Sequence, residues 1–362
     1  MRILHFAAEN FAGVPGTLVR AERELGHDSL LMTLFPSAQG IADGELCLNL
    51  PFVRSAAVRR IKALLHPDSV RVGTRRRGGA AGYPPVWTPA NGIQAALLRL
   101  RDRIWEPAIR HTLRRVRIED VDILFLDGGL GFLRNDTIAA GLKARGKRIA
   151  VGYFGSDLRT RGILPEIDRL ADFRFTVEFD HTLLYPGIAF VYFPFRLPGF
   201  HRPPAPPGGR IRIGHSPSNR AMKGTESILN GLRRLSRDFP VETVLIEGLP
   251  YAEALSVKST CDLFVDQLGE LGYGISGLEA LAMGIPTAVQ LMPDFDRFLA
   301  PHPFISVTGE ELAERLAPFA ASAELRRSRG EAGRAWVRER HDPVRVAKGL
   351  LDRLFIHPEA CA

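Results

Sequence analysis

Cysteine is scarce in this sequence, and long uninterrupted hydrophobic runs are absent. The three cysteines, Cys47, Cys261 and Cys361, are an odd number without CxxC spacing, which argues against a disulfide framework and a zinc site. No stretch reaches the roughly 18 apolar residues that a membrane-spanning helix needs. The opening MRILHFAAEN has a short apolar run and no small-residue cleavage pattern, so we expect a buried strand there rather than a signal peptide. These features predict a soluble protein in a reducing, cytoplasmic compartment.

A dinucleotide-binding fingerprint is also missing. A strand is expected at residues 3–6, and the loop after it reads GVPG instead of GxGxxG. The loop glycines Gly13 and Gly16 precede a predicted helix at 17–25 and a strand at 29–33, which together make a βαβ opening. Turn chemistry accounts for these glycines as well as ligand binding does. A nicotinamide cofactor therefore has no support, while both glycines stay candidates for a site in the first domain.

The length of 362 residues exceeds what one hydrophobic core usually serves, so two domains are expected. Strands separated by helices recur along both halves and predict parallel, doubly wound sheets. The fold class is α/β, with two Rossmann-like domains facing a cleft. We place the first domain at residues 1–200 with a basic helical and loop insertion at 51–120, the second at 201–342, and a C-terminal helix crossing back to the first domain at 343–362. Five prolines between residues 198 and 209 mark the linker.

The insertion carries the net positive charge. Residues 51–120 hold 15 Lys and Arg against 5 Asp and Glu, whereas the rest of the chain holds 33 against 35. Helical spacing predicts basic amphipathic helices at 52–65 and 94–116, and the arginine-rich segment 70–91 between them indicates a loop. In the second helix the apolar positions are Leu97, Leu100, Ile104, Ala108, Ile109, Leu113 and Val116, with arginines on the remaining surface.

Three interpretations of this basic segment stay open. It is suited to lie on an anionic membrane surface, to bind an acidic acceptor, or to be a solvated surface insertion. The first would make a cytoplasmic protein peripheral on the inner face of the membrane. No aromatic interleaving supports RNA recognition, so we expect no nucleic-acid partner.

The most informative stretch is residues 266–286, DQLGELGYGISGLEALAMGIP, which follows a predicted strand at 263–265. A turn at Gly272 and Gly274 leads into a helix expected to begin near Gly277. Such a turn lets backbone N–H groups approach a phosphate closely, while the helix N-terminus supplies partial positive charge. The order of strand, glycine turn and helix therefore predicts a nucleotide site.

Two interpretations of Glu279 compete. In the first turn of this helix its carboxylate is within reach of a ribose. Alternatively, Ser276 and Glu279 form a capping box, in which Ser276 bonds the Glu279 backbone and Glu279 reaches back to the cap. On the residues alone the capping box is the better-supported of the two.

A second loop carries residues suited to a diphosphate. Residues 215–228, HSPSNRAMKGTESI, follow a strand expected at 211–214, and ligands of open parallel sheets lie beyond the carboxyl ends of strands. Arg220 and Lys223 in this loop would neutralise a diphosphate, whose negative charge grows as a sugar–phosphate bond breaks. The competing interpretation is a solvated basic turn capped by Thr225.

Together these motifs resemble the GT-B glycosyltransferases, in particular the large retaining group with a KG loop and an EAMA-type helix followed by GxP. The matching residues are Lys223-Gly224-Thr225, Gly272-Tyr273-Gly274 and the segment EALAMGIP at 279–286. The first domain adds MRILHF, ELGHD at 24–28 and GSDLR at 155–159, similar to the opening strand, first helix end and GSDLR loop of these enzymes. The resemblance spans nearly the whole chain outside the basic insertion.

The resemblance implies a hexosyltransferase-type enzyme. Its donor would be a UDP- or GDP-sugar bound in the C-terminal domain, and its acceptor a glycan or a lipid-linked group held largely by the N-terminal domain. Glu279 would bind the donor ribose and Lys223 the diphosphate, without a metal ion. The lack of a DxD-type pair in a suitable loop agrees with this, since Asp294 and Asp296 are expected at the surface.

The predicted site divides into three groups of residues. The catalytic candidates are Lys223, Arg220 and Asp157. The donor-binding candidates are Ser218, Asn219, Gly272, Tyr273, Gly274, Ile275 and Glu279. The acceptor-side candidates are Gly13, Gly16, Asp127 and Gly155. Asp127 and Asp157 lie at predicted strand ends, where a helix cap or a turn residue fits equally well, so no general base is assigned.

Two alternative functions are kept. A nucleotide-sugar epimerase can share this two-domain architecture. A catalytically degenerate GT-B binding protein is the other, because Leu271 and Phe154 occupy positions where related enzymes often carry Glu and His.

Overall fold

The computed structural model describes residues 1–37, 45–51, 84–155, 157–196, 209–269 and 272–355. The chain divides into two compact units: Met1–Pro194 together with Pro343–Ala362, and Phe195–Asp342. The first unit thus ends at Pro194 rather than at residue 200, and the helix that starts at Pro343 belongs to it. Nearly all of the predicted proline-rich linker lies outside the described residues.

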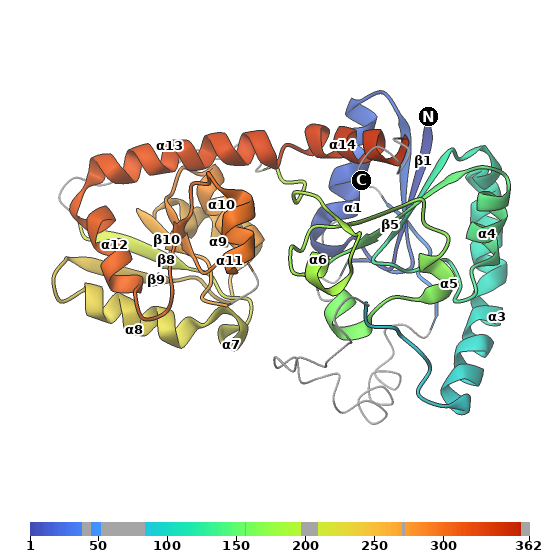
Figure 1. Ribbon diagram of the computed structural model, residues 1–362, viewed down its shortest axis with the longest axis horizontal. Coiled ribbons are helices and arrows are strands. Elements are labelled where there is room, and N and C mark those ends of the chain that lie inside the picture. The colour runs from blue at the N-terminus through green and yellow to red at the C-terminus, as the bar shows by residue number, and fades with distance from the viewer. Residues whose placement is uncertain (38–44, 52–83, 156, 197–208, 270–271, 356–362) are drawn as a thin grey trace. The chain divides into compact units, whose positions relative to one another are not determined.

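The first unit is built on a parallel seven-stranded sheet with the order β3-β2-β1-β4-β5-β6-β7. Figure 1 labels β1 and β5 of this sheet. Its strands are β1 (Arg2–Ala7), β2 (Asp28–Thr33), β3 (Leu46–Cys47), β4 (Ile123–Asp127), β5 (Arg148–Tyr153), β6 (Phe173–Thr176) and β7 (Ala189–Phe190). Every residue of β4 is buried, as expected for a central strand covered on both faces. The reversal of strand order at β1 and β4 is the topology of a Rossmann-like, doubly wound domain.

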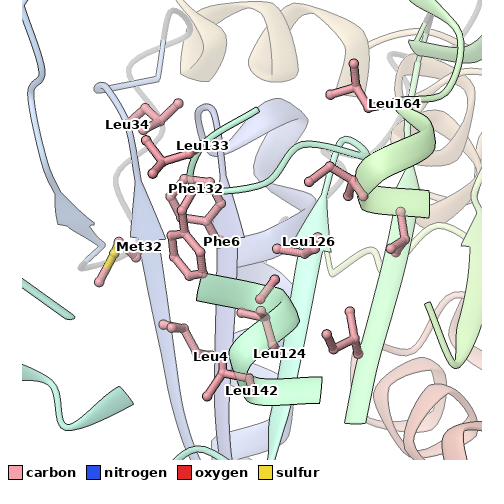
Figure 2. Packing of buried hydrophobic residues seen from close by; sticks show 14 of the residues in the cluster. Leu4, Phe6, Met32, Leu34, Leu124, Leu126, Phe132, Leu133, Leu142 and Leu164 are labelled. Atoms are coloured by element: carbon pink, nitrogen blue, oxygen red, sulfur yellow. The ribbon is translucent and has the colours of Figure 1, made fainter. Parts of the chain in front are cut away.

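Helices cover both faces of this sheet. They are α1 (Val14–Glu24), α3 (Gly92–Arg115), α4 (Thr137–Ala144), α5 (Pro165–Asp168), α6 (His181–Leu184) and α14 (Pro343–Phe355), with short turns η1 (Phe11–Gly13), η3 (Ile118–Asp120) and η4 (Asp157–Arg161). One face packs against α3 and α4, and Figure 2 shows Leu4, Phe6, Leu124 and Leu126 pointing into that cluster. The opposite face packs against α1 and α14, because successive side chains of a strand alternate between faces.

The second unit has a smaller parallel sheet of five strands with the order β12-β11-β10-β8-β9. Its strands are β8 (Ile211–His215), β9 (Val241–Leu245), β10 (Leu263–Val265), β11 (Thr287–Val289) and β12 (Ile305–Ser306). Its helices are α7 (Arg220–Lys223), α8 (Thr225–Leu235), α9 (Tyr251–Ser259), α10 (Ile275–Ala282), α11 (Pro293–Leu299), α12 (Leu312–Ala321) and α13 (Ala323–Arg340). One face packs on α8 and α12 and the other on α9 and α10, so this sheet is doubly wound as well.

Helix α3 differs from the expectation for residues 94–116. It begins at Gly92, where Asn91 accepts a hydrogen bond from the Gln94 backbone N–H at 2.8 Å. Its apolar residues divide into two sets: Trp105, Ile109 and Leu113 are buried, whereas Ile93, Leu97, Leu100 and Ile104 are exposed. The helix predicted at 52–65 and most of the loop predicted at 70–91 lie outside the described residues.

Candidate functional site

Two loops of the second unit meet at the carboxyl edge of its sheet. Strands β8 and β10 are parallel neighbours, so the loops that follow them leave the same edge. From the first loop, the Nζ of Lys223 donates to Asp266 Oδ1 at 3.3 Å and to Gln267 Oε1 at 2.7 Å. The backbone N–H of Leu268 donates to the carbonyl of Lys223 at 3.1 Å. The structure thus joins the predicted KG loop to the segment that leads into the glycine turn.

This junction leaves no room for side chains at its glycines. A Cβ on Gly274 would lie 2.8 Å from Lys223 Nζ, and a Cβ on Gly277 would lie 2.8 Å from Asp266 Oδ2. Gly224 has φ +66°, where only glycine is unstrained, and a Cβ there would meet the carbonyl oxygen of Leu268 at 2.9 Å. The glycines therefore permit the close approach of Lys223 to the start of α10.

Asp266 is a buried member of the site that the sequence did not single out. Its side chain is fully buried, accepts from Lys223, and accepts from the backbone N–H of Gly274 just before α10. A carboxylate at a helix N-terminus is stabilised by the helix dipole. The signal that would have found it is its position, since Asp266 directly follows β10 on the edge where ligands bind.

Helix α10 begins earlier than predicted, and this changes the interpretation of Glu279. The helix starts at Ile275 with Gly274 as its N-cap, and no side chain caps it. The capping-box prediction is wrong, because Ser276 lies inside the helix and its hydroxyl accepts from Lys258 Nζ at 2.7 Å. The Glu279 carboxylate therefore does not cap α10, and its partners come from another helix.

Those partners come from α9. Oε2 of Glu279 forms an ion pair with Lys258 Nζ, and Oε1 accepts from the Tyr251 hydroxyl at 2.9 Å. Lys258 is only 2% exposed and its ammonium lies 4.9 Å from the centre of the Phe264 ring. Sequence reasoning missed Lys258 because a lysine on a surface helix normally reaches solvent. The available signal was that it lies three residues after the buried Leu255, on the same side of α9.

The other predicted residues of the KG loop have different partners. Asn219 is the N-cap of α7 and accepts from the Met222 backbone N–H at 3.1 Å. Arg220 places two nitrogens on the Glu247 carboxylate at 2.9 and 2.6 Å on the exposed surface. The prediction that Thr225 caps this turn is wrong, since Thr225 Oγ1 lies 2.9 Å from His215 Nε2 instead. Ser218 is exposed beside Asn219.

Tyr273 lies in an aromatic cluster rather than beside Lys223. Its ring stacks on Phe295 and Phe304, with ring centres 5.4 and 4.9 Å away, and packs edge-on against Trp336. Gly272 has φ +125°, and a Cβ there would meet the Phe295 ring at 2.9 Å. The side chain of Tyr273 therefore anchors the glycine turn to the unit, and Ile275, the first residue of α10, is half-buried.

The acceptor-side candidates lie at the carboxyl edge of the first sheet. Gly13 has φ +73° and caps α1, and the backbone N–H of Gly16 donates to Asn10 at 3.0 Å. Gly155 has φ +53°, and a Cβ there would lie 2.9 Å from the Phe11 ring. The structure gives these glycines turn and packing roles.

Asp157 opens the turn η4 after β5. Its Oδ2 accepts from the Phe154 backbone N–H at 3.1 Å, and its Oδ1 lies 3.8 Å from Arg161. Burial raises its pKa, against the opposing positive charges of Arg161 and Arg159. The Phe154 side chain is buried against Phe175, so this position supplies no polar group.

Asp127 belongs to a buried cluster of charged side chains with His5 and Glu22. His5 Nδ1 lies 2.8 Å from Asp127 Oδ2, and His5 Nε2 lies 3.1 Å from Glu22 Oε1. The His5 ring also stacks on Phe125 at 4.3 Å. Burial alone would lower the pKa of His5, but the charges of Glu22 and Asp127 raise it to about 10. Asp127 thus balances a protonated histidine in the interior of the first unit.

The cluster predicts a loss of stability at alkaline pH. A histidine whose pKa is raised on folding stabilises the protein fully below its ordinary pKa, and this contribution disappears as the pH rises through the folded value. As the pH rises from about 7 to 10, we expect the free energy of unfolding to fall by up to about 1.4 kcal/mol per pH unit through this group. Urea unfolding across this pH range measures the slope.

The control is the isosteric double variant Glu22→Gln/Asp127→Asn. Without the two carboxylates, burial lowers the pKa of His5, so the slope assigned to His5 vanishes while that of all other groups remains. Equal pH dependence in the wild type and the double variant would show that His5 is not protonated in the folded state.

Solved structures resemble this chain over almost its full length. Sucrose-phosphate synthase from Thermosynechococcus elongatus aligns with a TM-score of 0.55 and 12% identity, covering 98% of each chain. HepE from Anabaena in complex with UDP aligns with a TM-score of 0.54 and 12% identity, covering 98% of this chain and 99% of HepE. The fold is that of the GT-B glycosyltransferases. No protein-family model and no curated protein matches the sequence.

Within the described part of the chain, no group of three or more His, Cys, Asp or Glu side chains is arranged to hold a metal ion. Asp294 pairs with Arg297, and Asp296 accepts from Ser306 Oγ at 2.6 Å. None of the described helices has the length and hydropathy to cross a membrane.

Proposed function

We propose that this GT-B chain is a glycosyltransferase that moves a sugar from a nucleotide-diphosphate sugar to an acceptor with retention of anomeric configuration. One observation supports the proposal: Lys223 and the glycine turn before α10 meet at the carboxyl edge of one parallel sheet, and Glu279 lies in the helix that this turn starts. Ligands of open α/β sheets bind at this edge. The complex of HepE with UDP supports UDP as the first nucleotide to test.

Lys223 is the proposed electrostatic partner of the diphosphate. Its side chain retains 17% exposure and already lies between two oxygen acceptors, Asp266 and Gln267. A diphosphate would exchange these oxygens for its own. Its negative charge grows as the bond to the sugar breaks, so the ammonium stabilises the transition state more than the ground state. Arg220 would have to leave Glu247 to take part, and we give it a secondary role.

Glu279 is the proposed ribose ligand. Lys258 forms an ion pair with its buried carboxylate, and the Tyr251 hydroxyl donates to Oε1, where a ribose hydroxyl would donate instead. Tyr251 is 59% exposed, so it can move aside without disturbing the core. The N–H groups of Ile275 and Ser276 begin α10, where backbone donors lack partners within the helix and would donate to a bound anion. Ser218 and Asn219, on the exposed loop that carries Lys223, are the further proposed donor ligands.

The acceptor is proposed to be a glycan or a lipid-linked group held by the first unit. Asp157 is the acceptor-side carboxylate, because Asp127 is already engaged by His5. Gly13, Gly16 and Gly155 shape the loops around it. No protein general base is assigned, since a retaining transfer does not require one, and no metal is proposed.

A thermal-shift screen of UDP-, GDP- and ADP-sugars tests the donor. We expect one nucleotide class to raise the Tm, because a ligand that binds only the folded state stabilises it in proportion to the logarithm of its concentration over Kd. A flat response to all three classes at millimolar concentration would contradict the proposal.

A degenerate binding protein is the second candidate, favoured by the buried Phe154 in the loop where a polar side chain would otherwise lie. Product analysis with the bound nucleotide sugar separates the candidates. Transfer to water or to an added acceptor supports the transferase, and unchanged donor over many hours supports the binding protein. A donor recovered with one inverted sugar carbon identifies an epimerase.

A further inference from the structure

The first half of α3 has no buried side chain. The three buried residues of this 24-residue helix, Trp105, Ile109 and Leu113, all lie in its second half, where they join the main hydrophobic cluster. From Gly92 to Ile104 no side chain is buried. Figure 1 shows α3 at the outer edge of the unit. Since helix stability in proteins comes mainly from packing of an apolar face, large apolar residues that the first half leaves unburied need another explanation.

That sequence places four large hydrophobic residues on one exposed stripe. Their exposed fractions are 74% for Ile93, 53% for Leu97, 53% for Leu100 and 44% for Ile104. The spacings of four, three and four residues put all four on one face of the helix. The stripe lies on the side opposite the anchor residue Ile109, so it faces away from the core. Scattered exposed leucines are ordinary, but a contiguous stripe marks an interaction surface.

Positive charge flanks the stripe. Arg99 and Arg103 are exposed along one border, and the next turns of that border carry Arg110 and Arg114. Asp102 is 14% exposed at its side chain and bound to Arg101, and Glu106 offsets one arginine of this border by pairing with Arg110. Within the described ranges no carboxylate pairs with Arg99 or Arg103. An exposed apolar stripe bordered by arginines matches the interface of a bilayer with anionic headgroups, where leucines enter the acyl boundary and arginines reach phosphates.

We propose that the stripe Ile93, Leu97, Leu100 and Ile104, with Arg99 and Arg103 beside it, docks the protein on an anionic lipid bilayer. The helix would lie in the interface rather than cross it. This surface belongs to the first unit and does not depend on the donor site, so the proposal stands or falls independently of glycosyl transfer. It would bring the acceptor-side unit to a membrane where lipid-linked acceptors are found.

Vesicle flotation with the full-length protein tests this. We expect binding to vesicles of phosphatidylcholine mixed with phosphatidylglycerol, weaker binding to phosphatidylcholine alone, and release as salt rises. The variant Leu97→Gln/Leu100→Gln should bind these vesicles at least about tenfold more weakly than the wild type, because the stripe loses its apolar contact. Arg99→Gln/Arg103→Gln should lose about tenfold on anionic vesicles and little on neutral ones.

The matched control is Leu183→Gln/Leu249→Gln, which replaces two leucines of similar exposure, 52% and 42%, outside α3. It should bind as the wild type does, and circular dichroism should show all variants folded. Equal vesicle binding by the α3 leucine variant and the wild type would overturn the proposal. So would absence of binding by the wild type at low salt, or a dimer that the α3 leucine variant converts to a monomer, since another part of the chain or a second copy would then cover the stripe.

Discussion

The variant Lys258→Met is expected to lose about 3–5 kcal/mol of the free energy of unfolding, because it leaves the Glu279 carboxylate buried without a cation. Lys258 and Glu279 are 2% and 5% exposed, so solvent cannot replace the lost partner. Of the remaining contacts, the Tyr251 hydroxyl bonds only Oε1. Chemical denaturation of the purified variant, followed with a spectroscopic signal from the second unit, measures this loss in the free energy of unfolding.

The double variant Lys258→Met/Glu279→Leu is the control. Replacing both members of a buried ion pair by apolar residues of similar volume is often close to neutral in stability. We therefore expect the double variant to recover most of the loss and still to bind no donor, which separates the folding role of the pair from the ribose role of Glu279. A loss under about 1 kcal/mol in the single variant, typical of a surface pair, would show that the ion pair is solvated.

Lys223→Ala is expected to weaken nucleotide-sugar binding by about 10- to 100-fold, the range of one charge-assisted hydrogen bond to phosphate. The same change removes a partner of the fully buried Asp266, so some stability is lost as well. Lys223→Ala/Asp266→Asn removes both charges and keeps an acceptor for the Gly274 N–H. This double variant should be folded and still bind donor weakly.

Arg220→Ala is the matched comparison from the same loop. Its guanidinium is held by Glu247 on the surface, so its loss should weaken donor binding less than the loss of Lys223. If the two alanine variants bound the donor equally, the assignment of the diphosphate to Lys223 would be wrong.

The sequence predicted the alternation of strands and helices and the two-domain fold because those patterns depend on hydrophobic periodicity, which short windows reveal. It also marked Lys223 and the glycine turn, since close backbone approach demands glycine at particular positions. The sequence could not predict the hydrogen-bonding partners of these residues. Lys258 and Asp266 are buried charges, and only the three-dimensional arrangement shows what neutralises them.

Two features that the sequence left undecided or predicted incorrectly have the same physical origin. The boundary of α10 is set by the fit of Gly274 against Lys223 and Asp266, so a local capping pattern at Ser276 predicted it incorrectly. In α3, two apolar stripes share one helix, and spacing alone does not say which of them meets the core. In both cases contacts distant in sequence decided between locally equivalent arrangements.

Calorimetric titration of the wild type and Lys223→Ala with the nucleotide sugar that gives the largest thermal shift tests the central claim most directly. We predict one site per chain in the wild type and a 10- to 100-fold weaker Kd in the folded variant, on the order expected for a lost charge-assisted bond. An unchanged Kd in a folded Lys223→Ala protein would contradict the donor site proposed at the carboxyl edge of the second sheet.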